Sequence, residues 1–296
     1  MGWLPTSARP SIAASVYGFL AFIGFEAAAP MAEETKNPRR TVPRAVVLSC
    51  LLIGLFYVLT SYASSVYFGP AKMAEFMSYN GGNAWIGLAT TLWGNGWILL
   101  LVVLLISSFA CMNGAALAAT RSIWAMGRSG TLPRFFGYVH PRWRSPSKSI
   151  LVFFGLGTVL TLVGGYTWDP VTAYAVFGTV LTVCVLPIYF VTALACPVYF
   201  LRYRRGEFNV FLHLIAPVLG AILLIPAFFA GAGIPVFSFA SALSYPLSLA
   251  GPIVGTWYVI GFGVMVYLMK RRNDSLDRLA ESVDPEPTPV LAAEVG

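Results

Sequence analysis

The chain has 296 residues, of which 57% are hydrophobic and only 10% are charged. A soluble domain carries about 25% charged residues, so this composition excludes the soluble classes and predicts an all-α polytopic membrane protein. The net charge of +7 does not indicate a nucleic-acid partner, because the basic residues gather between the apolar stretches. The chain has only two histidines and twelve acids, so few side chains could bind a metal ion, and we expect no metal site.

The gaps between charged residues predict seven transmembrane helices, because an apolar run of about 20 residues can cross a bilayer. These spans are expected near residues 11–32, 45–68, 96–120, 149–167, 171–200, 210–230 and 251–269. Together they form a membrane domain over residues 1–272. Residues 273–296 combine acids with prolines and have too little apolar surface to offset the entropy of ordering, so we expect a disordered cytoplasmic tail.

The basic residues predict the orientation of the chain. Four of them lie in residues 33–44, six in 121–148, three in 202–207 and four in 270–278, and all of these segments fall on one side of the seven expected spans. The opposite side has only Arg9 and Lys72. Cytoplasmic loops are enriched in Lys and Arg, so the N-terminus is expected outside and the C-terminus inside.

The first expected span carries a single acid, Glu26, inside its apolar run. A carboxylate at such a position costs about 2.5 kcal/mol or more, which makes it a candidate functional group. Gly18, Gly24 and Pro30 are spaced so that the helix can open between about Phe22 and Pro30, exposing carbonyls that suit an ammonium group. Two plainer alternatives remain open: a kinked packing helix, and an acid that only hydrogen-bonds a neighbouring helix.

Two stretches carry a family resemblance. The first, GFLAFIGFEAAAPMAEETKNPRRTVPRAV at residues 18–46, resembles the sixth helix and following loop of amino acid permeases of the amino acid–polyamine–organocation superfamily. The second, NGAALAATRSIWAMGRSGTLP at residues 113–133, is similar to the eighth helix of that family and its cytoplasmic exit. The resemblance covers residues 11–272, and the last four spans match mainly by spacing and topology.

The resemblance implies a fold of two inverted repeats of five helices, of which this chain looks like the sixth to the twelfth helix. It implies a secondary-active permease in the plasma membrane, not an enzyme, driven by a proton or sodium gradient and without a cofactor. The substrate would be an amino acid or related amine. Helices one to five of the family are missing, so we expect the chain to be inactive alone, to pair with a complementary N-terminal half, or to self-associate.

The resemblance also assigns candidate residues. In the family, the broken sixth helix holds the substrate amine, and here the matching substrate-binding residues are Leu20, Ala21, Phe22, Ile23, Gly24 and Phe25. Glu26 would serve coupling or gating. Leu20 is aliphatic where the family often has an aromatic gate. Three polar residues of the third span could line the path of the substrate through the membrane, or could merely hydrogen-bond to other helices: Ser107, Ser108 and Asn113.

Other classes of membrane protein fit less well. A seven-span photoreceptor would want a lysine in residues 251–269, which contain none, and a receptor commonly has cysteines in its outer loops. An intramembrane enzyme needs a second embedded acid, a metal cluster or a nucleophile with its base. A receptor and a non-transporting remnant or accessory subunit remain the alternatives to transport.

Overall fold

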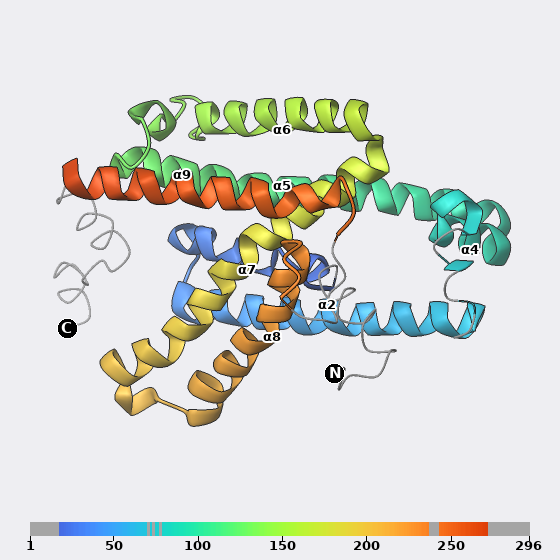
Figure 1. Ribbon diagram of the computed structural model, residues 1–296, viewed down its shortest axis with the longest axis horizontal. Coiled ribbons are helices and arrows are strands. Elements are labelled where there is room, and N and C mark those ends of the chain that lie inside the picture. Colours follow the sequence, from blue (N-terminus) through green and yellow to red (C-terminus); the bar gives the residue numbers. More distant parts are fainter. Residues whose placement is uncertain (1–17, 70–71, 73–74, 77–78, 237–242, 272–296) are drawn as a thin grey trace. The chain divides into compact units, whose positions relative to one another are not determined.

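A computed structural model of the chain describes residues 18–69, 72, 75–76, 79–236 and 243–271 (Figure 1). Every regular element within these residues is helical. The first part of the expected span at 11–32 and the expected tail at 273–296 lie outside them.

Six helical stretches in the described part of the chain are long and apolar enough to cross a membrane: Pro38–Phe68, Ala84–Ser129, Ser147–Trp168, Pro170–Tyr203, Phe211–Gly231 and Leu247–Lys270. Large apolar side chains cover the outside of these helices; Leu51, Tyr62 and Leu99, for example, are each about two-thirds exposed. Apolar surface on this scale is what a lipid environment would cover. The protein is therefore an all-helical polytopic membrane protein. The remaining expected span, residues 11–32, stays a prediction, because residues 11–17 lie outside the described part of the chain.

The helix ends differ from the expected span ends. Helix α2 (Pro38–Phe68) begins before residue 45, because Pro38 occupies its first turn, where a proline is tolerated. Helix α5 (Trp97–Ser129) continues past residue 120 through Arg121 and ends at Gly130, whose φ of 80° suits a helix terminus. Charges mark where lipid contact ends rather than where the helix ends, because long basic side chains can reach the interface from within a helix.

The charge pattern did not predict the short helix that precedes α5. Helix α4 (Ala84–Trp93) follows the 3-10 turn η3 (Tyr79–Gly82) and packs against α5. The turn η4 (Gly94–Gly96) separates α4 from α5, and Gly94 has a φ of 55°. At ten residues, or about 15 Å, α4 is too short to cross a bilayer by itself.

The chain divides into two compact units. One unit runs from Gly24 to Phe154 and contains the 3-10 helix η1 (Phe25–Glu34), α2, α4, α5 and the 3-10 turn η5 (Arg134–Gly137). The other combines the residues up to Ile23 with those from Gly155 onwards. Helix α6 (Ser147–Trp168) begins in the first unit and continues in the second.

The second unit is built around α7 (Pro170–Tyr203). The π-turn η7 (Phe211–Ile215) leads into α8 (Ala216–Gly231), which folds back along α7 (Figure 1), and α9 (Ala250–Arg271) packs against α7 as well. Val183, Ala232 and Val254 form its buried core. The Tyr258 hydroxyl donates to the carbonyl of Cys184 at 2.6 Å, which ties α9 to α7.

Candidate substrate site at the interrupted helix

The first apolar segment is interrupted where the sequence predicts a break. Residues 18–22 are helical, Ile23 and Gly24 form a turn, and η1 follows from Phe25. The amide of Ile23 donates to the carbonyls of Phe19 and Leu20, at 3.2 Å each, which closes the first helical piece. Gly24 has a φ of 121°, a conformation that residues with a Cβ rarely adopt, so glycine is required at this turn.

Glu26 stabilises the break by a hydrogen bond to the backbone close to it in sequence. Its Oε2 accepts a hydrogen bond of 2.9 Å from the amide of Gly24. In a continuous helix that amide would donate to the carbonyl of Leu20, so the break frees the donor and the carboxylate satisfies it. Glu26 also lies in the first turn of η1, where the helix dipole favours a negative charge.

This role of Glu26 was not part of the sequence analysis, which weighed hydrogen bonds to other helices only. The spacing of Gly24 and Glu26 contains the signal, because an acid in the first helical turn commonly reaches back to an amide at the helix start. Glu26 as a whole residue is half-buried. Helix η1 packs against both α2 and α5.

The predicted substrate-binding residues fall on both sides of the break. Leu20, Ala21, Phe22 and Ile23 belong to one compact unit, whereas Gly24, Phe25 and Glu26 belong to the other. In the first group, Leu20 lies against Gly178 of α7, where an added Cβ would come within 2.8 Å of the leucine Cδ2. The structure joins Leu20 to Ile23 and Gly24 to Glu26 by hydrogen bonds.

The three polar residues expected along a path lie on α5, and all three are exposed: Ser107, Ser108 and Asn113. The hydroxyl of Ser108 donates to the carbonyl of Leu104, one turn earlier in the same helix, at 2.9 Å. Such a bond satisfies the hydroxyl within its own helix rather than across helices. A path along these residues stays a prediction.

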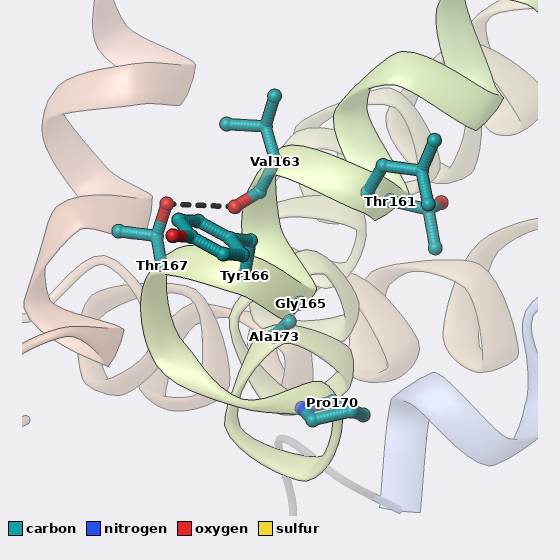
Figure 2. Close-up of a pocket in the computed structure, with 8 residues that line it drawn as sticks. Thr161, Val163, Gly165, Tyr166, Thr167, Pro170 and Ala173 are labelled. Carbon is teal, nitrogen blue, oxygen red and sulfur yellow. Dashed lines mark hydrogen bonds between the residues drawn. The ribbon is translucent and has the colours of Figure 1, made fainter.

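Two hollows occur in the second unit, and neither includes a predicted site residue among the described residues that line it. One, of about 750 Å³, lies where α6 meets α7 (Figure 2) and is lined by Thr161, Leu162, Val163, Gly165, Tyr166, Thr167, Pro170 and Ala173. The Thr167 hydroxyl there donates to the carbonyl of Val163 at 2.7 Å. The other, of about 340 Å³, lies between α7 and α8 and has apolar walls. The described lining of both hollows is uncharged.

Residues 3–259 match the family described as "Amino acid permease". The low-affinity putrescine importer PlaP of Escherichia coli (strain K12) is 28% identical over 225 residues, covering 72% of this chain and 45% of that protein. The human cystine/glutamate transporter is 28% identical over 148 residues, covering 50% of this chain and 28% of that protein. The branched-chain amino acid permease BcaP of Bacillus subtilis (strain 168) is 28% identical over 164 residues, covering 55% of this chain and 33% of that protein.

The chain thus spans less than half the length of these curated relatives. No solved structure matches it. The relatives are transporters and not enzymes, and the family match extends over most of the sequence. The chain belongs to the amino acid permease family.

Proposed function

We propose that the protein takes part in secondary-active transport of an amino acid or related amine across the plasma membrane, driven by a proton or sodium gradient and without a bound cofactor. The observation that carries the proposal is the break at Ile23 and Gly24, with a carboxylate at the start of the second helical piece. The names of the relatives support the substrate class, because putrescine, glutamate, cystine and branched-chain amino acids all carry an ammonium group.

The substrate amine is proposed to bind the backbone of the break, formed by Leu20, Ala21, Phe22, Ile23, Gly24 and Phe25. The last carbonyls of a helix point beyond its hydrogen-bond ladder, and an ammonium group donates readily to carbonyl oxygens. Phe22 is about one-third exposed and Phe25 is half-buried, so either ring can cover a bound substrate.

Glu26 is proposed to couple transport to the ion gradient. Its carboxylate already fixes the geometry of the break by accepting from the Gly24 amide. A change in its protonation alters that hydrogen bond and therefore the shape of the proposed amine site. Proton binding and substrate binding are linked in this way through two neighbouring residues.

Transport is further proposed to need a complementary set of helices, supplied by an N-terminal half rather than by a second copy. Alternating access requires one bundle to rock against another around a shared site. The match covers only 45% of the putrescine importer. In this proposal the helices form part of a fold of inverted five-helix repeats, with the N-terminus outside and the C-terminus inside.

The decisive experiment compares Glu26→Gln with Glu26→Ala in uptake of labelled amino acids and putrescine by cells that express the native gene. Glutamine keeps an oxygen that can accept from the Gly24 amide but cannot titrate, whereas alanine removes both properties. Both variants should lower gradient-driven uptake by roughly 5- to 150-fold, the range of typical coupling free energies, and Glu26→Gln should lose its pH dependence.

Glu207→Gln serves as the matched control, because Glu207 is an exposed acid that pairs with Arg204 at 2.7 Å, far along the chain from the break. It should leave uptake unchanged. If Glu26→Gln transports like the wild type at every pH while Glu26→Ala does not, the carboxylate only holds the break and the proposed coupling is wrong.

A further inference from the structure

The connection between α5 and α6, residues 130–146, is a basic segment without acidic neighbours in sequence. It contains Arg134, Arg142 and Arg144, and Lys148 follows in the first turn of α6. No Asp or Glu occurs from residue 76 to residue 168. The local sequence therefore leaves the positive charge of this loop to be balanced by something other than its own acids.

The loop presents two of its arginines from an ordered turn. The Nδ1 atom of His140 accepts from the amides of Arg142 and Trp143, at 3.2 and 3.4 Å. The carbonyl of His140 accepts from the amide of Arg144 at 2.9 Å, and its ring stacks on Trp143 with centroids 4.4 Å apart. Arg142 and Arg144 are both exposed. Their guanidinium groups thus extend from a backbone that is already fixed.

Packing holds this loop at the ends of α5 and α6, and the length of α6 would place these ends at a membrane surface. Helix α6 has 22 residues, or about 33 Å, which matches a hydrocarbon core of about 30 Å and places its first turn at the edge of the core. The buried hydroxyl of Ser149 in that turn donates to the carbonyl of Phe136 in η5 at 3.0 Å. On the other side, the backbone of Gly137 lies directly against Gly127 of α5. The loop therefore cannot lift away from the ends of the two helices.

Aromatic rings accompany the charges. The Nζ atom of Lys148 lies 4.7 Å from the ring centroid of Phe135 and 4.4 Å from that of Tyr138. The side chain of Trp143 is 67% exposed. Aromatic residues of this kind prefer the boundary between headgroups and acyl chains, where one part of the ring is apolar and the other is wet.

We propose that this loop binds the headgroup phosphates of anionic phospholipids. Arg142 and Arg144 donate to the phosphate oxygens, for which the planar guanidinium is well matched. Lys148 adds a third charge, and Trp143 lies at the headgroup boundary. None of these residues belongs to the proposed substrate site, and the lipid would bind whether or not the chain transports an amine.

The test uses the full chain in lipid nanodiscs that contain phosphatidylcholine with increasing fractions of phosphatidylglycerol. Native mass spectrometry after gentle detergent transfer counts the lipids that each protein retains. The wild type should retain phosphatidylglycerol in preference to phosphatidylcholine, and added salt should weaken that preference. The double variant R142Q/R144Q should weaken phosphatidylglycerol binding by roughly 10- to 30-fold and leave phosphatidylcholine binding unchanged.

The matched control is R204Q/R205Q, which removes the same number of charges from another loop. There Arg204 pairs with Glu207 at 2.7 Å, and the Nε of Arg205 donates to the carbonyl of Leu201 at 2.7 Å. The control should bind phosphatidylglycerol like the wild type. Equal losses in the two double variants, or unchanged binding by R142Q/R144Q with a wild-type unfolding temperature, would overturn the proposal. Displacement of the lipid by inorganic phosphate alone would equally contradict a lipid site.

Discussion

At the scale of single residues, the carboxylate of Glu26 accepts a hydrogen bond from the amide of Gly24 and thereby stabilises the break in the first helix. The acid stands out in an apolar run, and the glycines around it mark where a helix can open. Which backbone amide donates to the carboxylate depends on how the two helical pieces diverge at Gly24. The φ of 121° at that residue follows from the fold. A candidate charged residue can thus be found from the order of residues in the sequence, whereas the hydrogen bond that fixes its geometry cannot.

Asp169 gives a prediction at the same scale. It precedes α7, and its Oδ1 accepts from the amides of Val171 and Thr172 at 3.0 and 3.1 Å. Hydrogen bonds with Thr172, and then with Val171, hold the pKa of the Asp169 carboxyl below its usual value. Because the folded-state pKa is lowered, the stabilisation is present above the unfolded-state pKa of about 3.9 and is lost as pH falls through the lower folded value.

Asp169→Ala should therefore lower the unfolding temperature of the detergent-solubilised chain by roughly 2–4 °C at neutral pH. The difference from the wild type should shrink as the pH falls below about 4, because the wild type then loses the same stabilisation. Asp169→Asn keeps an acceptor oxygen, so its unfolding temperature at neutral pH should lie between those of the wild type and Asp169→Ala. A difference that stays constant down to strong acid would contradict this role.

At the scale of elements, apolar runs predict that helices exist but not where they end. The expected start at 45 lies inside α2 and the expected end at 120 lies inside α5, because basic side chains can continue a helix into the interface. The break at Ile23 and Gly24 was predicted because glycine and proline weaken the helical ladder locally. Helix α4 was missed because its residues, uncharged and flanked by glycines, gave no charge boundary.

The contact between α5 and η5 leads to a prediction about one glycine. A Cβ added at Gly127 would lie 2.6 Å from the carbonyl carbon of Phe136 and still closer to the amide nitrogen of Gly137, so the backbone of η5 would have to move. Gly127→Ala should destabilise the chain by about 1–3 kcal/mol, the typical cost of overpacking. The measurement is thermal unfolding in detergent.

Gly114→Ala, in the same helix, is the control. An added Cβ at Gly114 meets nothing within 4 Å, so this change should leave the unfolding temperature equal or slightly higher, because alanine favours a helix by about 1 kcal/mol over glycine. Equal effects of the two substitutions would show that the contact between α5 and η5 does not contribute to stability.

At the scale of the whole molecule, composition was enough to predict the class of protein, and ordered motifs were enough to predict the family. The low share of charged residues, 10%, reflects the lipid environment in which the chain folds. This share is a property of the entire sequence. The division into two compact units at Ile23 and Gly24 could not be predicted, because it depends on contacts between helices that are distant in sequence.

The proposed need for complementary helices is tested on the purified 296-residue chain. Reconstituted alone into liposomes with an imposed proton gradient, it should show no saturable uptake of labelled amino acids or putrescine, because alternating access needs two bundles. Parallel liposomes that contain a full-length relative of the same family provide the positive control. Gradient-dependent, saturable uptake by the chain alone would show that no further helices are needed.

The close contact of Gly127 with Gly137 also decides how α5 meets the thickness of a membrane. Its 33 residues extend about 50 Å, well beyond a hydrocarbon core of about 30 Å. If its last turn is fixed at the headgroups by the α5–α6 loop, the helix cannot move this excess length by sliding toward that surface. It must tilt, or project at its other end, where Gly94 turns the chain into α4. A change in bilayer thickness would then alter the tilt of α5 or the length that projects at its other end, while the basic loop keeps its depth.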